Sequence, residues 1–290
     1  MENNQEPQPK KSDILSIFLS QILVILVIFI IHSFFSMFNA YNVIIFQKLP
    51  QEIFETTDSN RRTEILEESY KEIQSSIEKD PGIFTTEYLD IIINQPLFLL
   101  WDRVIWALCF LLPAYFFLVK VMKTKCTTME EELGFQQLRL GLSVGIVIFL
   151  LVTSGSLFLE LIGQKPVLNK FNVVLFTKIE GNFPLLVWSI FTVGIVTGMI
   201  EELFFRGYLL NHFMDKGFEK EGLVFTSVIF GAMHYTPDSS VIIPIVLTIV
   251  GYIFGLYYVK TKNIWISISA HASYNSLGLI LAYFIGDKAL

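Results

Sequence analysis

Long apolar segments are the feature of this sequence that most constrains its fold. Residues 183–200, FPLLVWSIFTVGIVTGMI, contain no ionisable side chain, and residues 14–46 are apolar apart from His32 and a few amides and hydroxyls. About 20 such residues in a helix are enough to cross a bilayer. A transmembrane barrel would instead need short strands of alternating polarity, which uninterrupted apolar runs do not provide. The sequence therefore predicts an all-α fold, a polytopic transmembrane helical bundle.

Seven segments have the composition of membrane spans, and polar stretches separate them. They are residues 14–46, 96–122, 140–162, 183–210, 223–235, 241–259 and 264–284. In the sixth, Gly251 and Gly255 have the small-xxx-small spacing that lets helices approach closely. The expected organisation is a disordered N-terminus (1–13), a first transmembrane span (14–46), an acidic polar insertion (47–95) and a membrane core (96–290).

Residues 47–95 carry the net negative charge of the whole chain. They contain 11 acidic and 5 basic residues, a difference of −6, which equals the formal net charge of the protein. Leu66, Tyr70, Ile73 and Ile77 follow helical spacing, so we expect one amphipathic helix that ends at Pro81. A solvated lid packed on the membrane domain and a substrate-docking element are both open as its role.

Lysine and arginine residues are unevenly divided between the connections on the two sides of the membrane. With the N-terminus in the cytoplasm, most of them fall in cytoplasmic connections, whereas the other side holds mainly the insertion and Lys165, Lys170 and Lys178. This bias predicts a cytoplasmic N-terminus and an insertion on the opposite side. The expected location is a multi-pass integral membrane protein, in the cell membrane if the source is bacterial.

Two adjacent glutamates interrupt the fourth apolar segment. Charged groups inside a membrane are costly, about 2.5–3.5 kcal/mol at mid-bilayer on insertion scales, and usually face the bundle interior and serve function. Glu202 and Arg206 have the i, i+4 spacing of a helical ion pair, and Glu201 is rotated about 100° from Glu202 without that partner. We expect one carboxylate to be structural and the other to be free for chemistry. Asp102 and Arg103, near the start of the second span, are expected to form an ordinary interfacial pair.

Three ionisable side chains lie at matched depth in separate late helices. Counted from the helix ends at about 1.5 Å per residue, Glu201, His234 and His271 each lie about 12–18 Å below the same membrane face. The three side chains can therefore converge. Asn275 follows His271 by four residues and shares its helix face, and Phe230 precedes His234 by four. A buried carboxylate beside imidazoles can hold and deprotonate water, while an imidazole and an amide can donate to an oxyanion.

Other residues with reactive or ligating side chains are given structural interpretations. His32 is expected to be packed or to face an interface, and His212 is expected to be solvated in a loop. Cys109 in an apolar run and Cys126 in a polar loop form neither a disulfide framework nor a CxxC metal pair. The chain has no basic patch with interleaved aromatic residues, so its expected partners include the lipid bilayer but no nucleic acid.

Three motifs in order resemble a known family. EELFFR (201–206) fits EExxxR, FGAMH (230–234) fits FxxxH and HASYN (271–275) fits HxxxN. Together they resemble the CAAX-protease and bacteriocin-processing family (CPBP, or Abi) of intramembrane proteases. The resemblance extends over about residues 130–284, and the first span and the insertion fall outside it. Family members commonly have eight spans, so we expect about seven to eight.

The resemblance implies an intramembrane endopeptidase that acts on a membrane-associated peptide or protein from the cytoplasmic side. Glu201 would activate water with His234, and His271 with Asn275 would stabilise the oxyanion. Glu202 and Arg206 would brace the site, with Phe230 packed beside it. Prenylated C-terminal peptides, pheromone or bacteriocin precursors and membrane-protein tails are all open as substrates.

Cofactor use and two other functions are also open. Glu201, His234 and His271 are of the types that bind zinc, yet no HExxH helix is present and an asparagine-assisted oxyanion site needs no metal, so we favour metal-free catalysis. Buried glutamate and histidine also serve ion- or proton-coupled transporters, but those usually show internal repeats, which this sequence lacks. A non-catalytic membrane scaffold of the same family is the third hypothesis, and the intact motifs count against it.

The predicted topology can be tested by cysteine labelling at Ser75, inside the insertion. We expect Ser75→Cys to react with a membrane-impermeant reagent applied to intact cells, because the positive-inside bias puts the insertion outside. Labelling that occurs only after permeabilisation would reverse the orientation.

Overall fold

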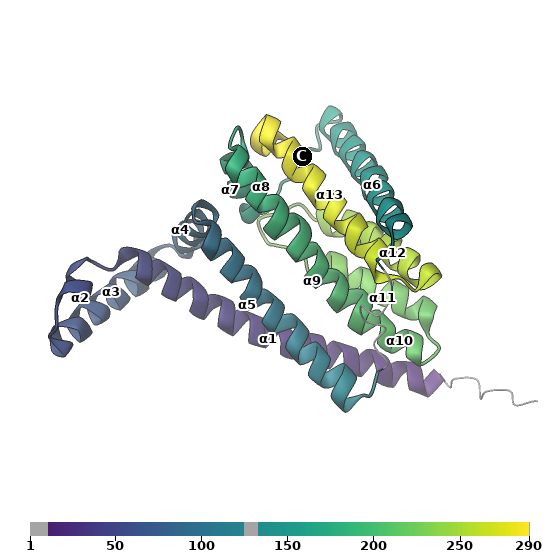
Figure 1. Ribbon diagram of the computed structural model, residues 1–290, viewed down its shortest axis with the longest axis horizontal. Helices are drawn as coiled ribbons and strands as arrows, with labels where there is room; N and C mark the ends of the chain where they lie inside the picture. The colour runs from purple at the N-terminus through teal and green to yellow at the C-terminus, as the bar shows by residue number, and fades with distance from the viewer. Residues whose placement is uncertain (1–10, 125–132, 290) are drawn as a thin grey trace, which may run out of the picture.

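The computed structural model describes residues 11–124 and 133–289, and within these ranges the regular structure is helical throughout, with no strand (Figure 1). Residues 1–10 of the predicted disordered N-terminus, together with Cys126 and the start of the family resemblance near Glu130, lie outside the described residues. Residues 11–13 belong to the first helix. The predicted all-α helical bundle is confirmed.

The helices follow the predicted spans closely, and the insertion adds three more. Their bounds are α1 (Lys11–Lys48), α2 (Glu52–Glu55), α3 (Ser59–Lys79), α4 (Pro81–Asn94), α5 (Pro96–Ala114) with η1 (Tyr115–Val121), α6 (Phe135–Leu161), α7 (Lys170–Ile179), α8 (Phe183–Ser189), η2 (Ile190–Thr197), α9 (Gly198–Glu202), η3 (Leu203–Leu210), α10 (Asn211–Asp215), α11 (Glu219–Ala232), α12 (Ile242–Thr261), α13 (Ile264–Ile285) and η4 (Gly286–Ala289).

Five helical segments in the described part of the chain are long and apolar enough to cross a membrane, fewer than the seven to eight predicted. They are Ile14–Lys48, Pro96–Val121, Phe135–Leu161, Phe183–Asp215 and Ile242–Thr261. Of the other two expected spans, α11 has only 14 residues. α13 has 22 residues but is polar around SISAHASYN, and it packs against α6, η2, α9 and α12. Because neighbouring helices cover much of α13, it does not need the apolar composition of a lipid-facing helix.

Glycines set the close approach of the helix pairs around the site. A Cβ atom at Gly145 of α6 would overlap the carbonyl oxygen of Ala270 on α13. On α12, a Cβ at Gly251 would lie 2.9 Å from the Phe230 ring, and one at Gly255 would lie 2.6 Å from Leu223. The close approach predicted from the small-xxx-small spacing of these two glycines is therefore confirmed.

The N-terminal helices form an arm that packs against the rest of the bundle through shared apolar clusters. α1 and α5 run side by side, with α2 and α3 at one end, and α4 packs on α5 and α7 (Figure 1). The predicted amphipathic helix is α3, but its buried side chains are Ile65 and Ile73, whereas Leu66 and Tyr70 are exposed. Asp80 then caps the start of α4 by accepting from the Gly82 N–H at 2.8 Å.

A matched pair of substitutions in α6 tests this packing. Gly145→Ala should destabilise the protein by about 1–3 kcal/mol, because the added methyl group forces α6 away from the α13 backbone. Gly155→Ala in the same helix should be neutral or slightly stabilising, because nothing lies within 4 Å of the added atom and alanine favours helix. Thermal unfolding in detergent measures both, and equal melting temperatures would contradict the packing.

Candidate active site

One long helical segment, Phe183–Asp215, carries both glutamates. It consists of α8, η2, α9, η3 and α10, which lie in one line in Figure 1. η2 and η3 are π-helical stretches on either side of α9, the short turn that bears Glu201 and Glu202. Such wide turns are often found at functional sites.

Glu202 is the centre of a buried charge network. Its side chain is 0% exposed, and its Oε1 accepts from Arg206 Nη1 at 2.9 Å and lies 2.8 Å from His271 Nδ1. Arg206 also donates to the carbonyl oxygen of Gly251, and its guanidinium lies 5.1 Å from the Phe230 ring centre. The predicted Glu202–Arg206 ion pair is confirmed, and it extends to α12 and α13.

Glu201 is buried beside the same histidine but is held differently. Its Oε2 lies 3.7 Å from His271 Nε2 and 3.9 Å from His234 Nε2. These distances are too long for direct hydrogen bonds, and a water molecule can bridge groups at such separations. Neither Glu201 Oε2 nor Glu202 Oε2 has a hydrogen-bond partner among the described residues, but only Glu201 lines a cavity.

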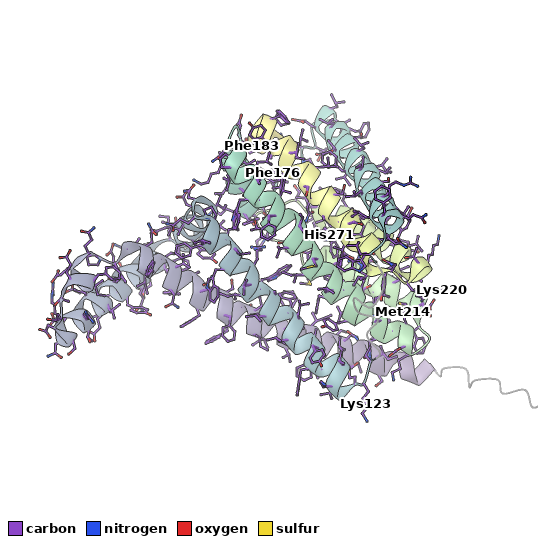
Figure 2. All side chains as sticks on the ribbon, viewed as in Figure 1. Lys123, Phe176, Phe183, Met214, Lys220 and His271 are labelled. Atoms are coloured by element: carbon purple, nitrogen blue, oxygen red, sulfur yellow. The ribbon has the colours of Figure 1, made fainter. Side chains whose placement is uncertain are left out.

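The two histidines present their Nε2 atoms to Glu201. His271 Nδ1 faces the Glu202 carboxylate, and His234 Nδ1 lies 2.7 Å from the carbonyl oxygen of Phe230. An acceptor beside Nδ1 keeps a proton on that nitrogen, so each Nε2 carries a lone pair in a neutral ring and an N–H in a charged ring. Figure 2 places His271 inside the bundle, between the regions labelled Phe183 and Lys220. The predicted convergence of the three side chains is present.

Two local features position these rings. A Cβ at Gly198 would lie 3.4 Å from both His271 Cγ and the Ala272 backbone nitrogen, so this glycine lets α13 approach α9. His234 lies in the turn that follows α11. The next segment contacts the start of α7, where Asp238 accepts a hydrogen bond from the Lys170 backbone N–H at 2.9 Å. The ring centres of Phe230 and His234 lie 4.9 Å apart, as expected for two residues four positions apart.

Asn275 and His212 differ from the rest of the predicted set. Asn275 donates to the carbonyl oxygen of Val193 at 3.3 Å, one turn beyond His271 on α13, and does not hydrogen-bond the glutamates. The prediction for His212 is wrong: it belongs to α10, is 4% exposed, and its Nδ1 lies 2.6 Å from Thr124 Oγ1. The long helix continues to Asp215, so His212 lies inside it rather than in a loop.

Glu201 and His234 line a cavity of about 410 Å³ between the N-terminal arm and the helices that carry these two residues. Its walls are mainly apolar and aromatic, and its volume lies within the range of small-ligand sites. His32 lines it too and packs edge-on to Phe110 at 5.3 Å. Sequence reasoning missed that Asp102 and Arg103 also line this cavity. Their charges inside an apolar run were the available signal, but their place near its start led to the assignment as an interfacial pair.

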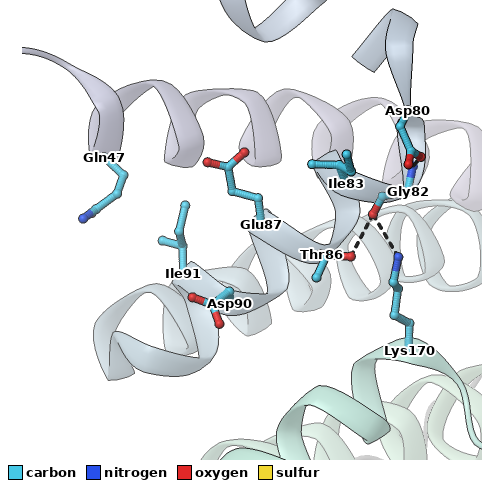
Figure 3. A pocket seen from close by; sticks show the side chains of 9 residues that line it. All are labelled: Gln47, Asp80, Gly82, Ile83, Thr86, Glu87, Asp90, Ile91 and Lys170. Carbon is cyan, nitrogen blue, oxygen red and sulfur yellow. Dashed lines mark hydrogen bonds between the residues drawn. The ribbon is translucent and has the colours of Figure 1, made fainter. Parts of the chain in front are cut away.

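A larger hollow of about 1060 Å³ lies elsewhere, between α4 and α7 (Figure 3). Its charges are satisfied by local contacts: Glu87 pairs with Lys48 at 2.9 Å and Asp90 with Lys178 at 2.7 Å. Lys170 donates to the carbonyl oxygen of Gly82 at 2.9 Å. Its lining contains no histidine, so it lacks the combination of glutamate and histidine found in the smaller cavity.

Zinc fits the three converging side chains poorly. Ligand atoms about 2.0–2.2 Å from a tetrahedral zinc ion lie about 3.3–3.6 Å apart, and both Glu201–histidine separations, 3.7 and 3.9 Å, are longer than this. No group of three or more His, Cys, Asp or Glu side chains in the described ranges is arranged to hold a metal ion.

Residues 183–277 match the family model described as type II CAAX prenyl endopeptidase Rce1-like. The matched segment contains all three motifs and the histidines and glutamates described above, and covers 95 of the 290 residues. Comparison with curated proteins finds no match, and neither does comparison with solved structures. The resemblance to the CAAX-protease family is thus confirmed for the segment that carries the site. The five apolar helices indicate an integral membrane protein, and the matched segment is similar to a family of peptide hydrolases.

The two glutamates should respond differently to loss of charge. Glu202→Gln should destabilise the fold by about 3–5 kcal/mol, because it leaves Arg206 buried without its counter-ion. Glu201→Gln should unfold at or near the wild-type temperature, since the buried Oε2 of that carboxylate has no hydrogen-bond partner among the described residues. Thermal unfolding in detergent compares the two, and equal stability would contradict the division of roles.

Proposed function

We propose that the protein is an intramembrane endopeptidase that hydrolyses a peptide bond with water activated by Glu201. One observation carries this proposal. The unpartnered Oε2 of Glu201 faces two imidazole Nε2 atoms at 3.7 and 3.9 Å, beside an apolar cavity within the helical bundle. A carboxylate in such surroundings is a suitable general base, because few competing donors hold its charge.

In the proposed first step, water lies between Glu201 and His234. Glu201 accepts one water proton as the oxygen attacks the carbonyl carbon, and the lone pair on His234 Nε2 accepts a hydrogen bond from the other. A C–O bond forms and the carbonyl becomes a tetrahedral oxyanion. His271, protonated on both nitrogens, donates from Nε2 to this oxyanion while its Nδ1–H remains on Glu202.

In the second step the C–N bond breaks, and Glu201 gives the proton that it accepted to the leaving amine. Asn275 serves as an additional oxyanion donor. When substrate binds, its side-chain amide exchanges the hydrogen bond to the Val193 carbonyl for one to the oxyanion. The bracing by Glu202 and Arg206 keeps His271 oriented throughout. No serine or cysteine nucleophile takes part, so no acyl-enzyme forms.

The substrate proposed is a membrane-associated peptide or protein, cleaved on the cytoplasmic side of the lipid bilayer. The aromatic and aliphatic cavity walls suit an apolar segment. A prenylated C-terminal peptide is the first to test, because the matched family model is that of CAAX prenyl endopeptidases.

Cleavage by purified protein in detergent tests this mechanism. Glu201→Ala and His234→Ala should both lose activity almost completely, because both hold the attacking water. Asn275→Ala should be milder, about 10²–10³-fold, the typical effect of one oxyanion donor. Glu160→Ala is the matched control, since this carboxylate lies at the exposed end of α6 in a loose pair with Lys165 at 3.5 Å.

Activity of Glu201→Ala equal to wild type would exclude the proposed mechanism. A strong chelator should leave wild-type activity unchanged. Loss of activity with the chelator and its recovery with zinc would instead assign a metal to Glu201, His234 and His271.

A further inference from the structure

A second polar cluster lines the cavity that contains Glu201. Tyr88 of α4 and Asp102 and Arg103 of α5 face the same space as Glu201 and His234. All three precede residues 183–277, so the segment that matches the family model does not include them. The cavity therefore has one end with the proposed chemistry and another polar region contributed by the N-terminal arm.

Asp102 is fixed by two short hydrogen bonds. The Tyr88 hydroxyl donates to its Oδ1 at 2.6 Å and accepts from the Asn39 side-chain amide at 3.0 Å, and Arg103 Nη2 donates to its Oδ2 at 2.6 Å. Burial raises the pKa of Tyr88, and the Asp102 charge raises it further, so the hydroxyl remains a donor. The cluster thus joins α1, α4 and α5.

Arg103 is positioned by contacts that leave donors unused. Its guanidinium lies 5.8 Å from the Trp106 ring centre and 5.4 Å from that of Phe171. Ring contacts of this kind hold the cation without consuming its N–H groups. A guanidinium has five N–H donors, and Arg103 Nε is buried with no hydrogen-bond partner in the described parts of the chain. Arg103 is also the one lysine or arginine among the described residues lining this cavity.

We propose that Arg103 is a specificity-determining residue that binds a carboxylate of the peptide substrate and so fixes which bond reaches Glu201. The proposal rests on the proposed function, because it assigns the substrate end of the same cavity. A planar guanidinium matches a carboxylate with two parallel hydrogen bonds, and aromatic walls that exclude water strengthen them. Without Arg103, the negative charges of Asp102 and Glu201 would repel such a group. The carboxylate can be the free C-terminus or an acidic side chain.

Binding to the uncleaving Glu201→Gln protein tests the assignment directly. Three synthetic peptides share S-farnesyl-cysteine followed by two aliphatic residues. The first ends in methionine as the free acid, the second ends in methionine amide, and the third ends in glutamate amide. The acid should bind about tenfold more tightly than methionine amide, and the Arg103→Gln, Glu201→Gln double variant should bind both equally. Tight binding of glutamate amide would assign the carboxylate to a side chain, and weak binding would assign it to the C-terminus.

Cleavage kinetics separate an anchoring role from a structural one. Arg103→Gln should raise KM about tenfold for the acid peptide with little change in kcat, and leave the methionine amide peptide unaffected. Arg103→Lys should recover part of the loss, because lysine keeps the charge without the planar fork. Lys178→Gln is the matched control: it removes the cation of a 2.7 Å ion pair with Asp90, outside this cavity, and should discriminate between peptides as the wild type does.

Equal binding of all three peptides by Glu201→Gln, or no binding of any of them, would overturn the assignment. Equal losses for both peptides in Arg103→Gln would also overturn it, since a purely structural role predicts them. If the wild type cuts neither peptide while Glu201→Gln still prefers the acid, the proposed hydrolysis fails and the carboxylate site stands.

Discussion

The fully buried carboxylate of Glu202 joins the helices around the active site. It binds Arg206 on its own helical segment and His271 on α13, and Arg206 continues the network to the Gly251 carbonyl of α12. Removing one member of such a buried set is costly, because the remaining charge is left without compensation. The network therefore fixes the position of His271, and with it one of the two imidazoles that face Glu201.

The contrast between the adjacent glutamates follows from this arrangement. Glu202 uses its Oε1 in two short contacts, while Glu201 points toward the cavity and lies beyond hydrogen-bonding distance of both Nε2 atoms. One position along the helix thus separates a structural carboxylate from one that is available for a proton transfer. The aromatic rings of Phe230 and Phe254 pack around His271 and Arg206 and exclude water from the network.

Much of this arrangement could be predicted from sequence, because apolar length and helical spacing are local properties. The spans, the Glu202–Arg206 pair and the convergence of Glu201, His234 and His271 follow from them. Features that depend on which helices pack together could not be predicted. The burial of His212 requires the contact with Thr124, and the place of Arg103 in the cavity requires the arm to pack beside α9. Five of the seven predicted spans are long and apolar enough to cross a membrane, because α11 has only 14 residues and the polar α13 is covered by neighbouring helices.

Comparative proteomics of membranes that contain either the wild-type protein or Glu201→Ala tests the central claim most directly. The measurement compares the abundance of intact membrane-associated proteins and of their new termini. If Glu201 activates water for peptide hydrolysis, a defined set of substrates will accumulate uncut with Glu201→Ala and will return to the processed form with wild-type protein. Identical termini in the two membranes, with both proteins present at equal levels, would contradict the account.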